Sequence, residues 1–175
     1  MLFRSGLNAT RHLIDLGHTR IGMIGGPSRM MCSRARLDGY RAALETAGLP
    51  VDPKLVREGD FHHEAGYSAG RDLLSLSERP TAIFAGNDLQ ALGLYEAARE
   101  LGLGIPDDLS VVGFDDLPMA RWVGPPLTTV RQPLVAMAET AARLALRLGR
   151  GERLSSTRVD LATSLVIRHS TAAPR

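Results

Sequence analysis

The chain has 175 residues, of which 44% are hydrophobic and 23% are charged. These values are close to those of an average globular domain, so they exclude a chain that is disordered, collagen-like or coiled-coil throughout. The net charge is only +2, and the basic residues are interleaved with acidic ones, whereas nucleic-acid surfaces more typically cluster their basic residues. A single cysteine excludes an internal disulfide framework. The sequence shows neither a membrane span nor a signal peptide, so we expect a cytoplasmic protein.

Apolar runs bounded by turns alternate with segments of helical periodicity along the chain. In chain order, the pattern predicts helix 6–16, strand 20–25, helix 33–47, a weaker strand 55–61, helix 64–76, strand 81–84, helix 89–101, strand 110–114 and helix 134–148. Residues 149–157 are polar and predict a loop, and residues 159–170 hold enough β-branched side chains for one or two strands. Alternating strands and helices predict an α/β fold with a doubly wound, mainly parallel sheet and helices on both faces.

Polar side chains follow the predicted strands, at residues 60–61, 87–88 and 115–116, and a Gly-Gly-Pro turn follows the strand at residues 20–25. Ligands of open parallel sheets bind at the carboxyl ends of the strands, so these residues are the candidate site. Their carboxylate and carboxamide oxygens can accept hydrogen bonds from the hydroxyls of a sugar or the ring nitrogens of a base. Arg34 and Arg36 follow the Gly-Gly-Pro turn and are candidates for a charged donor facing these acceptors.

Each of these residues also has a simpler structural interpretation. Asn87 or Asp88 could cap the helix that begins near residue 89. Phe61 could be part of the core or could stack on a flat ligand. Met30 and Cys32 belong to a soft, apolar run that could fill gaps in the core or line a binding site. The sequence by itself leaves these alternatives open.

Patterns typical of catalysis are missing from the sequence. It contains no G-x-S-x-G elbow, no P-loop and no G-x-G-x-x-G at the start of a helix. The pair His62-His63 has no third metal ligand at a convincing spacing. We therefore expect no enzyme activity, no metal and no cofactor. An acidic Mg²⁺ pocket for phosphotransfer, built from Asp60 and Asp115, is an alternative, although Lys54 is the only lysine and does not follow a later strand.

Six segments carry a resemblance to a known family, and they occur in that family's order. They are HLIDLGHTRIGMIGGP at 12–27, RARLDGYRAALETAGL at 34–49, EGDF at 58–61, RPTAIFAGNDLQALG at 79–93, IPDDLSVVGFDDLPMARW at 105–122 and PPLTTVRQPL at 125–134. With these segments the chain resembles the effector-binding region of the lactose/galactose/purine-repressor family of bacterial transcription regulators. The resemblance implies a periplasmic-binding-protein-like fold of type I, in which a small effector lies between two lobes.

The resemblance also implies a division of the chain. The C-terminal lobe is expected at about residues 18–132 and 158–175, and helix 133–149 is expected to belong to the other lobe. The family's helix-turn-helix, hinge helix and first lobe do not match any part of this sequence, so we expect a part of a longer protein. Contact with operator DNA is expected only through that helix-turn-helix. The implied assembly is a homodimer, to which helices 33–47 and 64–76 could contribute.

The family's effector contacts can be transferred to this sequence one residue at a time. Arg36 stands at the position that grips the ligand, and Asp115 at the acidic position that accepts its hydrogen bonds. Asn87 or Asp88 matches the polar pair after the third strand, and Phe61 matches the aromatic position.

The segment at residues 28–32 supplies further contacts in the family, here Met30 and Cys32. Their soft apolar side chains favour an effector with an apolar face. The resemblance implies the ligand-sensing part of a transcription regulator with a sugar-like effector and no membrane partner. The alternative is a solute-binding protein of a sugar uptake system, which shares the fold but must be exported.

Overall fold

A computed structural model describes residues 2–153, 156 and 158–175 of the chain. The helices and strands are α1 (Leu2–Asp15), β1 (Ile21–Ile24), α2 (Met31–Thr46), β2 (Val56–Arg57), α3 (His63–Leu74), β3 (Ala82–Ala85), α4 (Asp88–Glu100), β4 (Ser110–Asp115), β5 (Thr128–Arg131), α5 (Leu134–Gly149) and β6 (Ser164–Val166). Short 3₁₀ turns precede β2 and follow β4, at Pro53–Leu55 and Pro118–Arg121.

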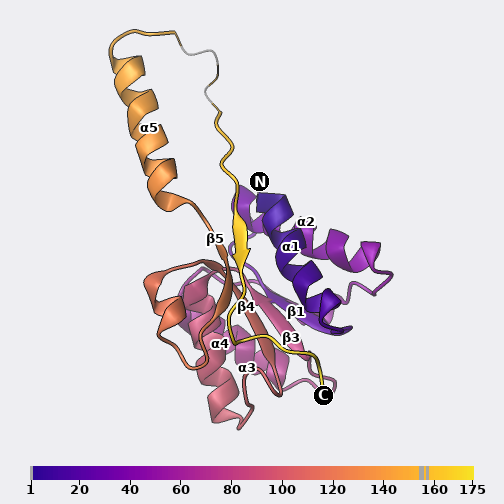
Figure 1. The fold of residues 1–175 in the computed structure, drawn as a ribbon. Coiled ribbons are helices and arrows are strands. Elements are labelled where there is room, and N and C mark those ends of the chain that lie inside the picture. The colour runs from indigo at the N-terminus through magenta and orange to yellow at the C-terminus, as the bar shows by residue number, and fades with distance from the viewer. Residues whose placement is uncertain (1, 154–155, 157) are drawn as a thin grey trace.

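The strands form one six-stranded sheet in the order β2-β1-β3-β4-β5-β6 (Figure 1). The first five strands pair in parallel, and β6 joins the edge antiparallel to β5. The order reverses between β1 and β3, which is the mark of a doubly wound sheet. The predicted doubly wound, mainly parallel α/β fold is therefore confirmed.

Helices cover both faces of the sheet, and each face has its own apolar core. Side chains of α1 and α2, such as Leu13 and Tyr40, pack on one face around Phe84. Side chains of α3 and α4, such as Leu94, pack on the other face around Ile83. Ile83 and Phe84 are neighbours in β3 and point to opposite faces because side chains alternate along a strand. Burial on both faces explains why the central strands are continuous apolar runs.

The structure differs from the predicted elements at several places. Helix α1 begins at Leu2, earlier than predicted, and the strand predicted at 55–61 is reduced to Val56–Arg57 because the chain turns away from the sheet after it. Strand β5 was not predicted, since its four residues lie in a short, proline-flanked segment with little periodicity. The region 159–170 forms one strand, β6. In the predicted loop at 149–157, residues 154, 155 and 157 lie outside the described residues.

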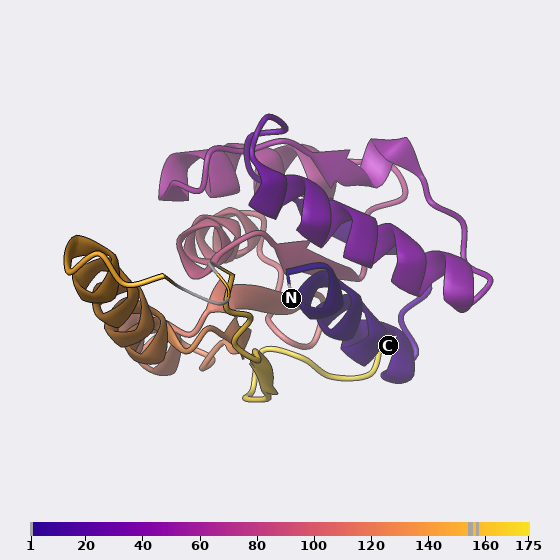
Figure 2. The ribbon, with the colours of Figure 1, turned by 90° about the horizontal axis from the view of Figure 1, so that it is seen from above.

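Helix α5 stands away from the sheet and its four covering helices in both ribbon views (Figures 1 and 2). None of its residues is buried. Strand β5 leads out to this helix, and the chain returns through β6 to the edge of the sheet. The rest of the described chain thus forms one packed α/β unit with α5 projecting from it.

Candidate functional site

The candidate site lies where the strand order reverses, between β1 and β3. In a doubly wound sheet the loops that follow two such strands diverge to opposite faces, which leaves a crevice at their carboxyl ends. Here the two loops begin with Gly25 and Gly86, whose backbones are tied to the sheet because the Gly86 N–H donates to the Ile24 carbonyl at 2.7 Å. The crevice therefore has a fixed backbone floor.

Arg36 lies beside this floor, on the second turn of α2. Its Nη1 donates to the Gly86 carbonyl at 2.5 Å. Its guanidinium carbon is 3.6 Å from the centroid of the Phe114 ring and 5.4 Å from that of Phe61, so two aromatic rings hold it. The residue is only 6% exposed, and its Nε has no hydrogen-bond partner among the described residues. Burial lowers the pKa of Arg36, and the nearby charge of Asp115 opposes this effect.

Asp115 ends β4 on the same side of the sheet as Arg36. Its backbone has a φ of 118°, which is unusual for a residue with a side chain. Its Oδ1 accepts a hydrogen bond of 2.6 Å from Gln132 Nε2. Burial raises the pKa of Asp115, while the Gln132 hydrogen bond and the Arg36 charge lower it. A carboxylate acceptor and a guanidinium donor are thus brought together at one edge of the sheet.

Phe61 and Asn87 are joined by a hydrogen bond and stabilise the other side of the crevice. Phe61 has a φ of 72°, and its carbonyl accepts from Asn87 Nδ2 at 2.9 Å. The Phe61 ring packs directly on Gly26, since a Cβ at Gly26 would lie 2.0 Å from the ring. Asn87 Oδ1 accepts from the backbone N–H of Gln90, so Asn87 is the N-cap of α4. The capping alternative for Asn87 is therefore confirmed.

Asp88 has no exposed surface. Its Oδ1 accepts from the Thr129 hydroxyl at 2.6 Å, and its Oδ2 accepts from the Leu117 N–H at 2.7 Å. Burial is the main cause that raises the pKa of Asp88 to about 6. Both carboxylate oxygens are engaged inside the protein, so Asp88 supports the site from within and offers no surface to an effector in this structure.

The loop before α2 forms the rim of the crevice. Met30 is 43% exposed and Met31 is 75% exposed, so the gap-filling alternative is wrong for these two methionines. Cys32 is half-buried and precedes Arg36 by one helical turn, so the two residues lie on the same side of α2. Arg34 is exposed and lines a pocket of about 100 Å³ that also includes Gly25 and Gly26. Of the two candidate arginines, Arg36 is the one beside Asp115.

Three residues of this site were missed in the sequence. Phe114 was identified only as a strand residue, and nothing local shows that its ring lies against Arg36. Gln132 follows β5, a strand that was itself missed. The Gly86 carbonyl is an acceptor on the backbone, for which no side-chain pattern gives a signal.

The alternative Mg²⁺ pocket has no counterpart in the described part of the chain. Asp60 is exposed and accepts a hydrogen bond from the His62 N–H at 2.9 Å. Within residues 2–153, 156 and 158–175, no group of three or more His, Cys, Asp or Glu side chains is placed to hold a metal ion. A search of the same residues finds no helix with the length and apolarity needed to cross a membrane.

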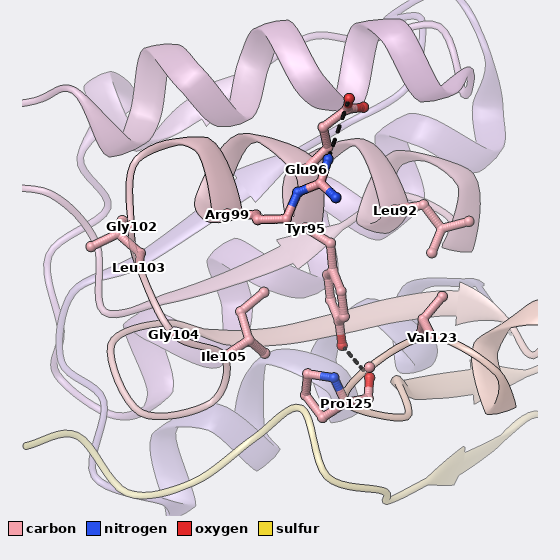
Figure 3. A pocket seen from close by; sticks show the side chains of 11 residues that line it. Leu92, Tyr95, Glu96, Arg99, Gly102, Leu103, Gly104, Ile105, Val123 and Pro125 are labelled. Atoms are coloured by element: carbon pink, nitrogen blue, oxygen red, sulfur yellow. Dashed lines mark hydrogen bonds and ion pairs between the residues drawn. The ribbon is translucent and has the colours of Figure 1, made fainter.

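A groove of about 670 Å³ lies on the outer surface of α4, apart from this crevice (Figure 3). Its lining comes from α4 and from the loops before β4 and before β5: Leu92, Tyr95, Glu96, Arg99, Gly102, Leu103, Gly104, Ile105, Val123, Gly124 and Pro125. The Tyr95 hydroxyl donates to the Pro125 carbonyl at 3.0 Å and ties the helix to the second loop. None of the predicted effector contacts lines this groove.

Comparison with known proteins places these observations in a family. Residues 10–171 match the periplasmic binding protein-like domain. The transcriptional regulator DegA of Bacillus subtilis is 42% identical over 97% of this chain and 50% of its own length. The solved complex of the transcriptional regulator CelR with cellobiose is 40% identical with a TM-score of 0.93, covering 97% of this chain and 52% of that one. A ribose-bound LacI family regulator from Enterococcus faecium is 32% identical with a TM-score of 0.89, covering 98% and 63%.

The chain spans about half the length of the curated relatives that it matches. Its six-stranded sheet and flanking helices superpose on part of the solved LacI family regulators, with 99% of this chain matching 62% of one from Escherichia coli at a TM-score of 0.89. The family match extends over nearly the whole chain, from α1 to the segment after β6. The chain therefore belongs to the family of periplasmic binding protein-like domains.

Proposed function

We propose that this chain is the ligand-sensing part of a bacterial DNA-binding transcription regulator and binds a sugar or a related polar metabolite. This proposal rests on one observation: Arg36, Phe61 and Asp115 come together where the strand order of the sheet reverses. The names of the relatives support it, since they are regulators, and two neighbours hold cellobiose and ribose. The same names favour a regulator over a solute-binding protein.

The three side chains match the chemistry of a sugar ring. Asp115 accepts hydrogen bonds from hydroxyl groups, and Arg36 donates to ring or hydroxyl oxygens through guanidinium N–H groups that the Gly86 carbonyl does not occupy. Phe61 offers an apolar surface for the C–H face of a ring, and Met30 and Cys32 extend that surface at the rim. Binding sites of this kind combine apolar walls with a few placed polar groups.

The domain division follows the same proposal. Residues 18–132 and 158–175 form the C-terminal lobe, and α1 packs beside α2 on one face of its sheet. Helix 133–149 contacts the other lobe of a longer chain. An effector held between the lobes favours one of their relative placements, and this population shift changes operator binding through a helix-turn-helix domain. The regulator acts in the cytoplasm and catalyses no reaction.

The test combines thermal unfolding with alkylation of Cys32, the sole cysteine. A sugar at 100 times its Kd stabilises the protein by about 2.7 kcal/mol. The bound sugar is also expected to slow the reaction of Cys32 with iodoacetamide. The ligands tested are sugars, sugar phosphates and nucleobases, beginning with ribose and cellobiose. Both effects should disappear in Arg36→Ala and Asp115→Ala.

The matched controls are Arg41→Ala and Asp38→Ala, which remove the same kinds of charge from exposed positions of α2. These variants should bind like the wild type. Binding that survives both Arg36→Ala and Asp115→Ala would show that the effector lies elsewhere.

The homodimer has a suitable surface in the groove on α4 (Figure 3). A two-fold interface brings the same patch of both copies together. Leu92, Tyr95 and Val123 supply apolar surface there, and Glu96 and Arg99, which pair with each other at 3.9 Å within one copy, add charges of both signs. This favours α4 over the two helices considered from the sequence as the centre of the interface.

Sedimentation velocity tests this assembly. Leu92→Glu places a charge in the groove and should yield a monomer. The control Leu146→Glu lies on the exposed surface of α5 and should leave the dimer intact. A dimer that persists in Leu92→Glu would contradict the proposed surface.

A further inference from the structure

The turn after β4 has an unusual backbone that must be held in place. Asp115 and Asp116 have φ values of 118° and 59°, so two consecutive residues with side chains lie in the left-handed region. Such conformations are costly and persist only where surrounding contacts enforce them. Asp tolerates this region better than most residues because its short side chain hydrogen-bonds locally. Contacts with Asp88, Arg131 and Arg168 hold this turn in place.

Asp116 connects the turn to β5 and to the segment after β6, at one edge of the sheet. Its side chain is only 2% exposed. Its Oδ2 accepts from Arg131 Nε at 2.6 Å, at the end of β5, and its Oδ1 accepts from Arg168 Nη2 at 2.5 Å, just after β6. Arg168 also donates to the Leu127 carbonyl at 2.7 Å, which anchors it independently. Asp116 is therefore fixed from two sides.

Asp88 holds the other end of the turn from beneath. Its hydrogen bond from the Leu117 N–H fixes the residue that follows the two aspartates. Its second oxygen accepts from Thr129 in β5, so Asp88 itself has a fixed position. The turn is thus clamped between a buried carboxylate from α4 and an arginine pair from the strand edge.

We propose that Asp88 and Asp116 are positioning residues that hold Asp115 in the orientation needed to accept hydrogen bonds from a sugar. The inference rests on the proposed function, in which Asp115 is the acceptor. From the sequence, Asp88 was either a helix cap or an effector contact, and Asp116 was one of the polar residues at the strand ends. In the structure neither acts at the surface of the crevice, and both act through the backbone of the turn.

The charges around the turn agree with this role. Asp88 faces the charges of Asp115 and Asp116 and the hydroxyl of Tyr95. Arg36 faces Asp115. The two arginines that bind Asp116 compensate its charge, which permits three carboxylates to lie close together. Loss of the Asp88 contacts or of the Asp116 contacts loosens the turn, so that Asp115 can rotate away from a ligand.

The experiment measures the Kd for ribose and for cellobiose, the melting temperature and the hydrogen exchange of the Leu117 amide. Asp88→Ala and Asp116→Asn should each raise Kd about tenfold, the cost of one misplaced hydrogen bond. The Leu117 amide should exchange about tenfold faster or more. Asp88→Asn should restore both values, because its amide can accept from Leu117 and donate to Thr129.

The control Asp72→Asn, on the exposed surface of α3, should match the wild type in all three measurements. A purely structural role would lower the melting temperature of Asp88→Ala and Asp116→Asn while Kd and Leu117 exchange keep their wild-type values. That outcome would overturn the proposal. If Asp116→Asn does not fold, Arg168→Ala removes one arm of the clamp and takes its place.

Failure of the proposed function gives a different result. If the wild type binds neither sugar, the effector assignment is wrong for these sugars. The exchange of the Leu117 amide still decides whether the turn is clamped, because that measurement needs no ligand. Unchanged exchange in Asp88→Ala, Asp116→Asn and Arg168→Ala would overturn the clamp whatever the effector is.

Discussion

Asp88 is a carboxylate without exposed surface that accepts hydrogen bonds from Thr129 and Leu117. Burial raises its pKa to about 6 from the ordinary value of 3.8, and the two hydrogen bonds limit this rise. The folded protein therefore binds this proton more tightly than the unfolded chain does. A difference of this size corresponds to about 3 kcal/mol of stability.

The raised pKa of Asp88 makes the folded state less stable as the pH rises. The stabilising contribution of the Asp88 proton is fully present below pH 4 and is lost as the pH rises through 6. The Asp88→Asn variant has no titrating proton at this position, and its amide can still bond to Leu117 and Thr129. Relative to the wild type, its free energy of unfolding should therefore increase by up to about 3 kcal/mol between pH 4 and pH 8.

Urea denaturation at five pH values across that range measures the difference. The exposed control Asp72→Asn should give a curve that stays within about 0.5 kcal/mol of the wild type. A curve for Asp88→Asn that runs parallel to the wild type throughout would show that Asp88 does not titrate in this range.

At the scale of the elements, glycines set how closely the helices approach each other. On one face of the sheet, a Cβ at Gly39 of α2 would lie 2.2 Å from the Phe3 carbonyl of α1. On the other face, a Cβ at Gly93 of α4 would lie 2.1 Å from the His63 carbonyl of α3. Each helix pair thus packs backbone to backbone. On the second face this contact fixes α4, whose N-cap residue, Asn87, holds Phe61 in the crevice.

Gly93→Ala tests this packing. The added methyl group must push α3 and α4 apart, and overpacking of this kind costs about 1–3 kcal/mol. The matched control is Gly149→Ala at the end of α5, where no atom lies within 4 Å of the added Cβ. That substitution should be neutral or stabilising by up to about 1 kcal/mol. Equal free energies of unfolding for the two variants would show that the helices are not in close contact.

At the scale of the whole molecule, the described chain is one packed sheet with an additional, uncovered helix. The 16 residues of α5 have no buried side chain, although Met137 and Leu148 would suit a core. A helix of this length is only marginally stable without tertiary contacts. Its apolar surface is the part of the molecule that the proposed second lobe would cover.

Substitutions in α5 should therefore have little effect on this chain alone. Met137→Glu and Leu148→Glu should each change the free energy of unfolding by less than about 0.5 kcal/mol. Leu94→Ala, in the core between α4 and the sheet, should cost about 2–5 kcal/mol. Thermal and urea unfolding of the three variants measure these changes in the free energy of unfolding. Losses in α5 as large as that of Leu94→Ala would mean that the helix is covered in solution.

Local patterns in the sequence were enough to predict the α/β class, the alternation of strands and helices, and the family. These properties depend on local periodicity and on short ordered motifs, which are present in the sequence before the chain folds. The sequence also indicated Asp115, which follows a predicted strand, and Arg36, which lies in the helix after the Gly-Gly-Pro turn and matches the family's ligand-gripping arginine. Strand β5 was missed because four residues between prolines carry too little periodic signal.

The side chains that contact each other could be identified only in the folded chain. Arg36 contacts the Gly86 carbonyl, 50 residues further along the chain, and the ring of Phe114. Asp88 points inward to Thr129, although its neighbour Asn87 supports the crevice. Such contacts depend on the order of the strands and on the direction of each side chain at a strand or helix end. A difference of one position there turns a side chain from the crevice to the interior, and no local pattern in the sequence encodes that choice.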